Sequence, residues 1–230
     1  MANHHPLDNP IWHALHTEHS ALAIGTGLAR CYPAAVGPLS GMADQSLASY
    51  EALRALAGPD GTLALFLADP PALPRGWTLV RDGTLSQMIC THLNAPADDP
   101  QPAIRRLTSA DVPAMLELTH LTEPGPFRER TIELGAFFGI FDAERLLAMA
   151  GQRLHLPRYV EVSAVCTHPD ARGRGYAYAL MAKAIREIQE RGKVAFLHVF
   201  SDNHAAIRVY ERLGFSVRRD LHLAVIRNDL

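Results

Sequence analysis

The clearest hydrophobic pattern of the chain lies in the segment Tyr176–Arg191. Apolar residues recur there at i, i+3, i+4 and i+7, the spacing of one face of an α-helix. Gly192 follows directly and is expected to end this helix. The apolar positions are Ala177, Leu180, Met181, Ala184, Ile185 and Ile188.

Shorter apolar runs on both sides of this segment predict alternating strands and helices. The expected order β-α-α-β-β-β-α-β-α-β indicates an α/β fold. Strands are predicted at Ala103–Leu107, Phe137–Asp142, Arg145–Leu154, Tyr159–Thr167, Val194–Phe200 and Phe215–Ile226, and helices at Ser109–Thr119, Phe127–Gly135, Tyr176–Arg191 and Asn203–Leu213.

Proline and acidic residues cluster at Asn94–Pro102, a stretch without periodicity that is typical of a linker. The sequence therefore predicts two domains, residues 1–98 and 99–230. The first is expected to be a smaller α/β domain. Its predicted helices are Pro10–Ala23 and Asp44–Ala57, and its predicted strands are Thr62–Ala68 and Leu85–Thr91.

Composition narrows the class of protein. Hydrophobic residues make up 48% of the 230 residues and charged residues 20%, a globular balance. The net charge of −2 argues against binding to nucleic acid or to an anionic membrane surface. No apolar run approaches the ~18 residues of a membrane span. Three cysteines and no secretory leader indicate a cytoplasmic protein with reduced thiols.

The segment Glu161–Ala177, EVSAVCTHPDARGRGYA, carries the most chemical information. A strand leads into a glycine-rich turn, and a helix begins at once. Gly173 and Gly175 would let backbone N–H groups approach an anion, while Arg172 and Arg174 add charge. The turn therefore predicts a pyrophosphate cradle, although neither GxxxxGK[ST] nor GxGxxG is present. The alternative is a tight turn that only needs glycine.

A second motif follows at the spacing Asn-x-x-Ala-x-x-x-Tyr-x-x-x-Gly-Phe. It consists of Asn203, Ala206, Tyr210, Gly214 and Phe215. Together with the run from Arg172 to Ala177, it resembles the GNAT superfamily of acyl-CoA N-acyltransferases over roughly residues 103–226. The segments EVSAVCTHPDARGRGYA and TEPGPF resemble the FR47-like branch of that superfamily.

The resemblance implies a GNAT fold, a mixed central sheet flanked by helices. It also implies acetyl-CoA as co-substrate and transfer of the acetyl group to a primary amine by direct attack on the thioester. The strands Tyr159–Thr167 and Val194–Phe200 should then diverge and open a V-shaped cleft. The implied cofactor-binding residues are Val165, Cys166, Thr167, Arg172, Gly173, Arg174, Gly175, Tyr176, Ala177, Asn203, Ala206 and Tyr210.

The resemblance gives two of these residues more specific roles. Tyr210 would protonate the departing thiolate, the alternative being a tyrosine packed on the sheet. Asn203 would bond the pantetheine amide or cap the helix that it begins. For Cys166 a covalent role competes with packing against a helix, which strand alternation favours.

Glu161 is the predicted general base. It lies eleven residues before Arg172, the offset at which histone-type acetyltransferases of the superfamily place their base. Alternation puts Glu161 on the same face as Ser163, Val165 and Thr167. The alternative is a glutamate in solvent or paired with Arg158. His155 and His198 are lesser candidates for the base.

Ile89–His92 repeats the pattern of Val165–His168, which raises the alternative that residues 1–98 are a degenerate GNAT-like half. The first copy continues as LNAPADD, without glycine or a helix start, so no second CoA site is predicted there. His13, His16 and His19 are interpreted as a polar helix face, and no metal is expected.

The sequence leaves the acceptor open between a small-molecule amine and a peptide, and it leaves a homodimer open. The competing function is a non-catalytic acyl-CoA-binding or interaction module with a GNAT fold.

Overall fold

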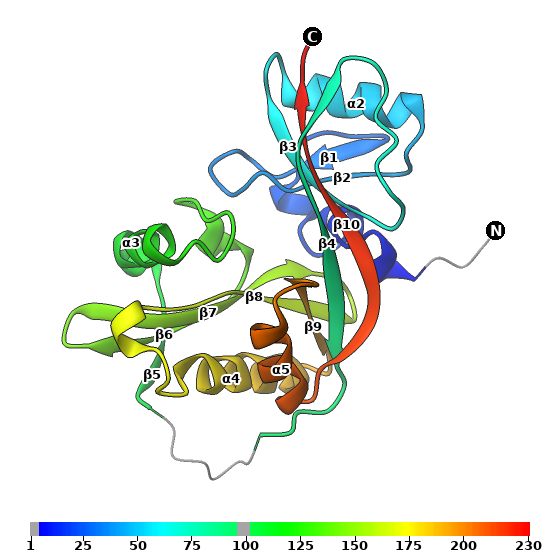
Figure 1. Ribbon diagram of the computed structural model, residues 1–230. Helices are drawn as coiled ribbons and strands as arrows, with labels where there is room; N and C mark the ends of the chain where they lie inside the picture. Colours follow the sequence, from blue (N-terminus) through cyan, green and yellow to red (C-terminus); the bar gives the residue numbers. More distant parts are fainter. Residues whose placement is uncertain (1–4, 96–101) are drawn as a thin grey trace.

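The computed structural model describes residues 5–95 and 102–230. Five α-helices and ten strands are present in these ranges, with short 3-10 turns between them (Figure 1). The helices are α1 Pro10–His16, α2 Leu47–Ala57, α3 Val112–Thr122, α4 Tyr176–Glu190 and α5 His204–Arg212. The strands are β1 Ala29–Cys31, β2 Ser40–Met42, β3 Thr62–Leu67, β4 Trp77–Cys90, β5 Ile104–Arg106, β6 Phe137–Asp142, β7 Arg145–His155, β8 Tyr159–Thr167, β9 Val194–Phe200 and β10 Ser216–Asn228.

Eight of the strands form one mixed sheet in the order β3-β10-β4-β9-β8-β7-β6-β5. Its neighbours pair antiparallel except β8 and β9, which run parallel. Figure 1 shows α3 on one side of the β6–β8 part of the sheet and α4 and α5 on the other. The predicted mixed sheet flanked by helices is thereby confirmed.

The pairing between β8 and β9 is short. It joins Tyr159–Glu161 to Val194–Phe196 and stops there, although both strands continue. Beyond that point the two strands diverge, as the family resemblance predicts. The backbone N–H and C=O groups at the inner edges of the open part are therefore not used by a β8–β9 ladder.

β8 carries an irregularity at Ala164, whose φ is 52°. Its register against β7 shifts there, with Ser163 opposite Gly151 but Cys166 opposite Met149. The prediction that Glu161 and Val165 share a face is consequently wrong. Val165 packs with the residues of α4, whereas Glu161 faces the other side of the sheet together with the side chain of His198. A bulge adds one residue to a strand and reverses the alternation after it.

Helix α4 covers one face of the sheet through the apolar positions that predicted it. Leu180, Met181, Ala184 and Ile185 have no exposed surface, and each of the three large side chains contributes about 1.5–3 kcal/mol by leaving water. Gly192 follows the helix with a φ of 70°, which only glycine adopts without strain. The helix thus holds its N-terminus firmly at the end of β8.

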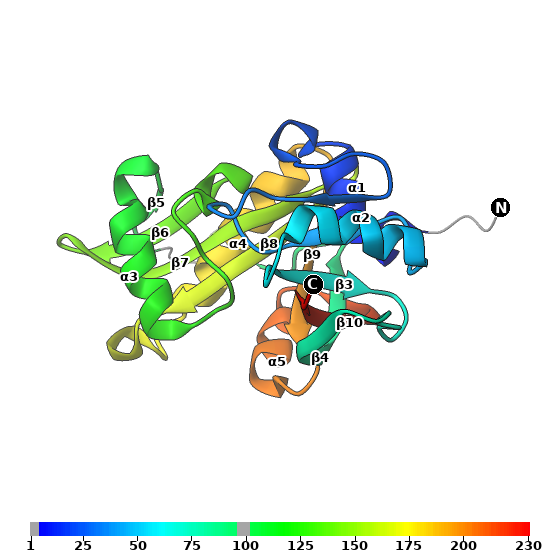
Figure 2. The ribbon, with the colours of Figure 1, turned by 90° about the horizontal axis from the view of Figure 1, so that it is seen from above.

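The region before residue 95 extends the sheet. β4 pairs with β9 on one side and with β10 on the other, and β3 pairs with β10 at the edge. Figure 2 shows α1 and α2 beside β3 and β10, away from α3. Residues 96–101, and with them most of the predicted linker, lie outside the described residues. The division into domains at residue 98 stays a prediction.

Two predicted helices are wrong in extent, because side-chain to backbone hydrogen bonds replace the helical ones. The first ends at His16, where the Thr17 hydroxyl donates to His13 O, and a short turn at Ser20–Leu22 follows. In place of the helix Phe127–Gly135 there is only a 3-10 turn, Thr131–Leu134. The Thr131 hydroxyl donates to Val36 O at 2.8 Å, so contact with the N-terminal region fixes this loop.

Candidate functional site

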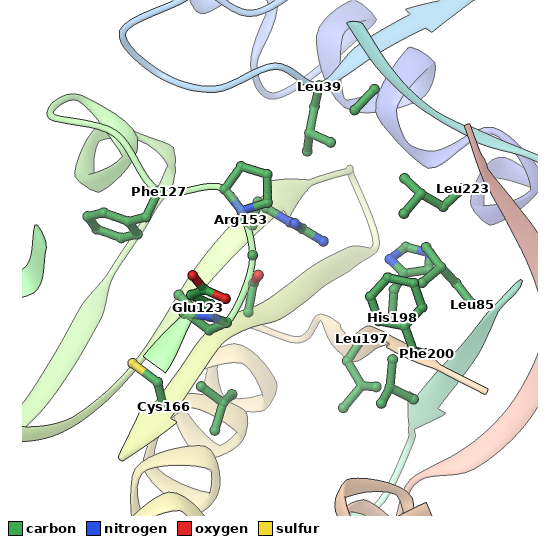
Figure 3. A pocket seen from close by; sticks show the side chains of 18 of the residues that line it. Leu39, Leu85, Glu123, Phe127, Arg153, Cys166, Leu197, His198, Phe200 and Leu223 are labelled. Carbon is green, nitrogen blue, oxygen red and sulfur yellow. The ribbon is translucent and has the colours of Figure 1, made fainter. Parts of the chain in front are cut away.

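A cavity of about 910 Å³ lies where β8 and β9 diverge (Figure 3). Its walls come from β8 and β9, from β3, β4 and β10, from the last residue of α3, Thr122, and from the loop 123–128 that follows it. Strands from both ends of the chain therefore line the same space. The predicted site residues that border it are Val165, Cys166, Thr167, Arg172, Asn203 and Tyr210.

The turn from Arg172 to Ala177 lies at the N-terminus of α4. Gly173 and Gly175 have φ values of 78° and 76°, and no atom lies within 4 Å of the position that a Cβ would take at either residue. Gly175 caps α4 without any side-chain hydrogen bond to the first turn. The backbone here is open, and free N–H groups at a helix N-terminus bind phosphate oxygens. The turn fits the pyrophosphate of a CoA molecule.

The flanking side chains of this turn differ in their surroundings. Arg172 borders the cavity, whereas the Arg174 side chain donates to Asp170 O at 3.2 Å. Tyr176 is half-buried against the core beneath α4. Of the two arginines of the turn, Arg172 therefore supplies the positive charge at the cavity.

Cys166 packs against α3. It is 6% exposed and belongs to an apolar cluster with Met115 and Leu118. Burial raises the pKa of its thiol to about 11. A thiol that stays protonated is a poor nucleophile, so this environment agrees with the packing interpretation rather than with covalent catalysis.

Tyr210 reaches the cavity from α5. Its ring lies 6.1 Å from that of Phe215, and burial raises the pKa of the phenol to about 12. The hydroxyl is accordingly protonated at neutral pH and available as a donor. Asn203 begins the same helix, and its Oδ1 accepts from the Ala206 N–H at 3.1 Å, which is an N-cap.

Glu161 is fully buried beneath the cavity. Arg153 donates to its carboxylate twice, from Nε at 2.8 Å and from Nη2 at 2.7 Å, and His198 Nδ1 lies 2.6 Å from Oε1. Burial raises the pKa of the carboxyl, but Arg153 and then His198 outweigh it and lower that pKa to about 2. A carboxylate held in this way is a weak proton acceptor. Its partner is Arg153 and not Arg158.

His198 has both ring nitrogens engaged. Gln87 Nε2 donates to Leu7 O at 2.8 Å and Gln87 Oε1 accepts from Arg218 at 2.9 Å, which fixes the orientation of the amide. The amide nitrogen can then only donate to His198 Nε2, at 3.0 Å. His198 Nδ1 is likewise engaged by Glu161, so neither ring nitrogen is free for an acceptor amine.

His155 lies away from the cavity. Its ring is 5.1 Å from that of His19, and burial lowers its pKa to about 3. It does not border the cavity. Two of the three predicted base candidates are therefore fully bonded, and the third is remote.

Two cavity residues were missed by sequence reasoning. Arg153 lies near the end of β7, eight residues before Glu161, a spacing that suits a pair across the β7–β8 hairpin. Glu123 follows α3 in the left-handed conformation, with φ 46° and ψ 52°. Among the described residues, Glu123 is the sole carboxylate that borders the cavity. No spacing in the sequence marks it, because its place depends on how α3 ends.

Two negative findings concern the described part of the chain. None of its helices has the length and apolar content needed to span a membrane. Its His, Cys, Asp and Glu side chains form no group of three or more that could hold a metal ion.

Comparison with known sequences gives a consistent family. A family model described as FR47-like protein matches residues 137–223. A mycothiol acetyltransferase from Salinispora arenicola is 31% identical over 220 residues, which is 88% of this chain and 68% of that protein. One from Actinosynnema mirum is 37% identical over 83 residues, 36% of this chain and 28% of that protein. The chain thus spans only about a quarter to a half of the length of several curated relatives.

Solved structures extend the similarity to the whole chain. A protein from Novosphingobium aromaticivorans, described as an acetyltransferase of the GNAT family, is 37% identical. The match covers 99% of this chain and 100% of that one, with a TM-score of 0.91. A GCN5-related N-acetyltransferase from Kribbella flavida shares the fold at 18% identity and a TM-score of 0.63.

The forked strands, the open turn before α4 and these similarities lead to one assignment. The chain belongs to the GNAT family of acetyltransferases, and its residues 137–223 are similar to the FR47-like protein family.

Proposed function

We propose that this protein is an acetyl-CoA-dependent N-acetyltransferase that transfers the acetyl group to a primary amine by direct attack on the thioester. The observation that carries the proposal is the joint placement of the two predicted motifs. Arg172 and Tyr210 border one cavity at the fork of β8 and β9. A cofactor lying between them would have its pyrophosphate at α4 and its sulfur near α5.

The backbone along the fork would hold the acetyl-CoA. The turn at Gly173 and Gly175 would bind the pyrophosphate, with Arg172 as a charged neighbour. The open edge of β8 from Val165 to Thr167 would pair with the amides of the pantetheine arm like an added strand. The N–H of Val165 or Cys166 would stabilise the oxyanion that forms on the thioester carbonyl.

Tyr210 would act as general acid. The amine nitrogen forms a bond to the carbonyl carbon, the C–S bond breaks, and the departing thiolate takes the phenolic proton. A phenol whose pKa is about 12 stays protonated until charge develops on sulfur.

Glu123 would accept the proton of the ammonium in place of Glu161. Its carboxylate borders the cavity, while that of Glu161 is enclosed by Arg153 and His198. Glu123 also stands at the C-terminal end of α3, where the helix dipole disfavours an anion, and in a backbone conformation that non-glycine residues rarely adopt. Such features gather at functional sites, where other needs outweigh local stability.

Thiol release from acetyl-CoA, measured against a panel of amines, tests the proposal. Calorimetry with acetyl-CoA supplies the binding half of the experiment. Binding together with amine-dependent release is expected. Tight binding without release for any amine would instead favour the non-catalytic acyl-CoA-binding module.

A further inference from the structure

The acceptor side of the cavity lies on the face of the sheet opposite α4. Apolar side chains from the N-terminal region and from β10 enclose it, and Figure 3 shows them around the Arg153 side chain. These side chains are Leu39, Phe66, Leu85 and Leu223. A water-filled charged groove for a basic peptide would have a different lining, so this part of the cavity suits a small molecule with an apolar body.

Arg153 borders the cavity among these apolar side chains and is the least exposed of its arginines, since Arg81, Arg128 and Arg172 are exposed. Its Nε and Nη2 are used by Glu161 at 2.8 and 2.7 Å, but Nη1 has no hydrogen-bond partner among the described residues. The side chain is 17% exposed, and its guanidinium lies 5.5 Å from the centre of the Phe66 ring. In Figure 3 the guanidinium points into the cavity.

The polar network behind Arg153 holds the guanidinium in place. Glu161 is bonded to His198, His198 to Gln87, and Gln87 to Arg218, across neighbouring strands. A buried ion pair is an expensive way to stabilise a fold, and apolar residues of the same size serve as well or better. A fixed guanidinium with one free edge is instead well suited to bind a carboxylate.

We propose that the acceptor is an apolar α-amino acid, whose carboxylate is bound by Arg153 Nη1. Its side chain would lie among Leu39, Phe66 and Leu223, and its amine would face Glu123 and the thioester. The inference rests on the proposed acetyl transfer and names the class of acceptor for that same site.

Matched acceptor pairs test the inference directly. L-phenylalanine is compared with 2-phenylethylamine, and L-leucine with 3-methylbutylamine, because each pair differs only by the carboxylate. We expect kcat/KM for the amino acid to exceed that for the plain amine by at least about tenfold, because only the amino acid can form a charge-assisted hydrogen bond with Arg153.

The variant Arg153→Gln with Glu161→Gln removes both charges of the pair, so that no buried charge is left without a partner. In this double variant the ratio of kcat/KM for the amino acid to kcat/KM for the plain amine should fall to about threefold or less. Arg128→Gln, at an exposed arginine of the same cavity, is the matched control and should keep the preference. Thermal unfolding confirms that each variant is folded.

Turnover of both members of a pair at equal kcat/KM would overturn the inference and leave the acetyl transfer standing. A folded double variant with an unchanged preference would do the same. Absence of turnover with every amine would overturn the inference together with the proposed function.

Discussion

The two walls of the cavity differ in what they present to a ligand. One side, the backbone wall, follows the edge of β8 that β9 leaves unpaired and ends at Arg172, next to the open turn of Gly173 and Gly175. Opposite, the wall made by β3, β4, β9 and β10 presents side chains such as Phe66, Leu85 and His198. The backbone wall suits the co-substrate, which would be the same molecule in every acetyl transfer. The side-chain wall suits the acceptor, because substitutions there can change which molecule fits.

The difference has a physical origin. Backbone N–H groups at a helix start depend on local conformation alone, so a short motif suffices to build them. A side-chain wall needs several strands at fixed distances. Here the insertion of β4 between β10 and β9 brings residues from the N-terminal region within reach of the fork. The comparison predicts that changes to the two walls separate co-substrate binding from acceptor chemistry.

The largest effect is expected where the walls meet, at Tyr210. Tyr210→Phe should lower kcat by roughly 10²–10⁴-fold and leave acetyl-CoA affinity nearly unchanged, because the phenol acts only when charge develops on sulfur. Steady-state kinetics and calorimetry give the two quantities. Tyr178→Phe makes the same change on α4, away from the cavity, and should have little effect. Wild-type turnover in Tyr210→Phe would remove the acid role.

The buried ion pair of Arg153 and Glu161, beneath the side-chain wall, should affect the free energy of unfolding. Glu161→Gln leaves the buried Arg153 without its partner, which should lower the free energy of unfolding by about 3–5 kcal/mol. Glu133→Gln removes an exposed pair with Arg130 and should lower it by no more than about 1 kcal/mol. Denaturant unfolding of both variants provides the comparison. Similar small losses in the free energy of unfolding would mean that the buried pair does not stabilise the fold.

The same carboxyl predicts a dependence of stability on pH. Its pKa is lowered from 4.5 to about 2, so the folded state binds its proton more weakly than the unfolded state does. The stabilisation is present above pH 4.5 and is lost as the pH falls from about 4.5 to about 2. Unfolding free energies measured across this range should show the loss in the wild type and a weaker one in Glu161→Gln. Parallel curves would contradict the assignment.

A substitution in the turn next to the backbone wall should weaken acetyl-CoA binding. Gly175→Val places a β-branched residue at a φ of 76°, which should distort the turn and weaken acetyl-CoA binding by at least about tenfold. Gly192→Val is the matched control, since Gly192 has a φ of 70° and equally open space at the other end of α4. Equal affinities of the two folded variants would remove the turn from the CoA site.

The last prediction concerns the number of CoA molecules bound, to which we expect the N-terminal region to add none. The sequence that follows Ile89–His92, LNAPADD, contains no glycine. Gly214 packs there against His92 O, only 2.2 Å from where its Cβ would stand. Calorimetry should therefore give one acetyl-CoA per chain. Two per chain would show that the N-terminal region has kept a cofactor site of its own.

Much of the backbone wall could be predicted from the sequence. The bounds of β8 and β9 agree with the predicted strands, and α4 begins at the predicted residue Tyr176. The glycines at 173 and 175 and the apolar period of α4 encode that geometry locally, because each depends on neighbours within a few residues. The family resemblance came from the same local motifs.

The side-chain wall was decided by tertiary structure. One residue in the left-handed conformation, Ala164, reverses the alternation of side chains along β8 after Glu161. No local sequence pattern predicts this residue. The partners of Glu161 lie on β7 and β9, and those of His198 extend to β4 and β10. Sequence by itself thus determined the open glycine turn at the start of α4, where the phosphate site is predicted. Only the sheet order determined which side chains share the cavity, because strands distant in the chain become neighbours only when the sheet forms.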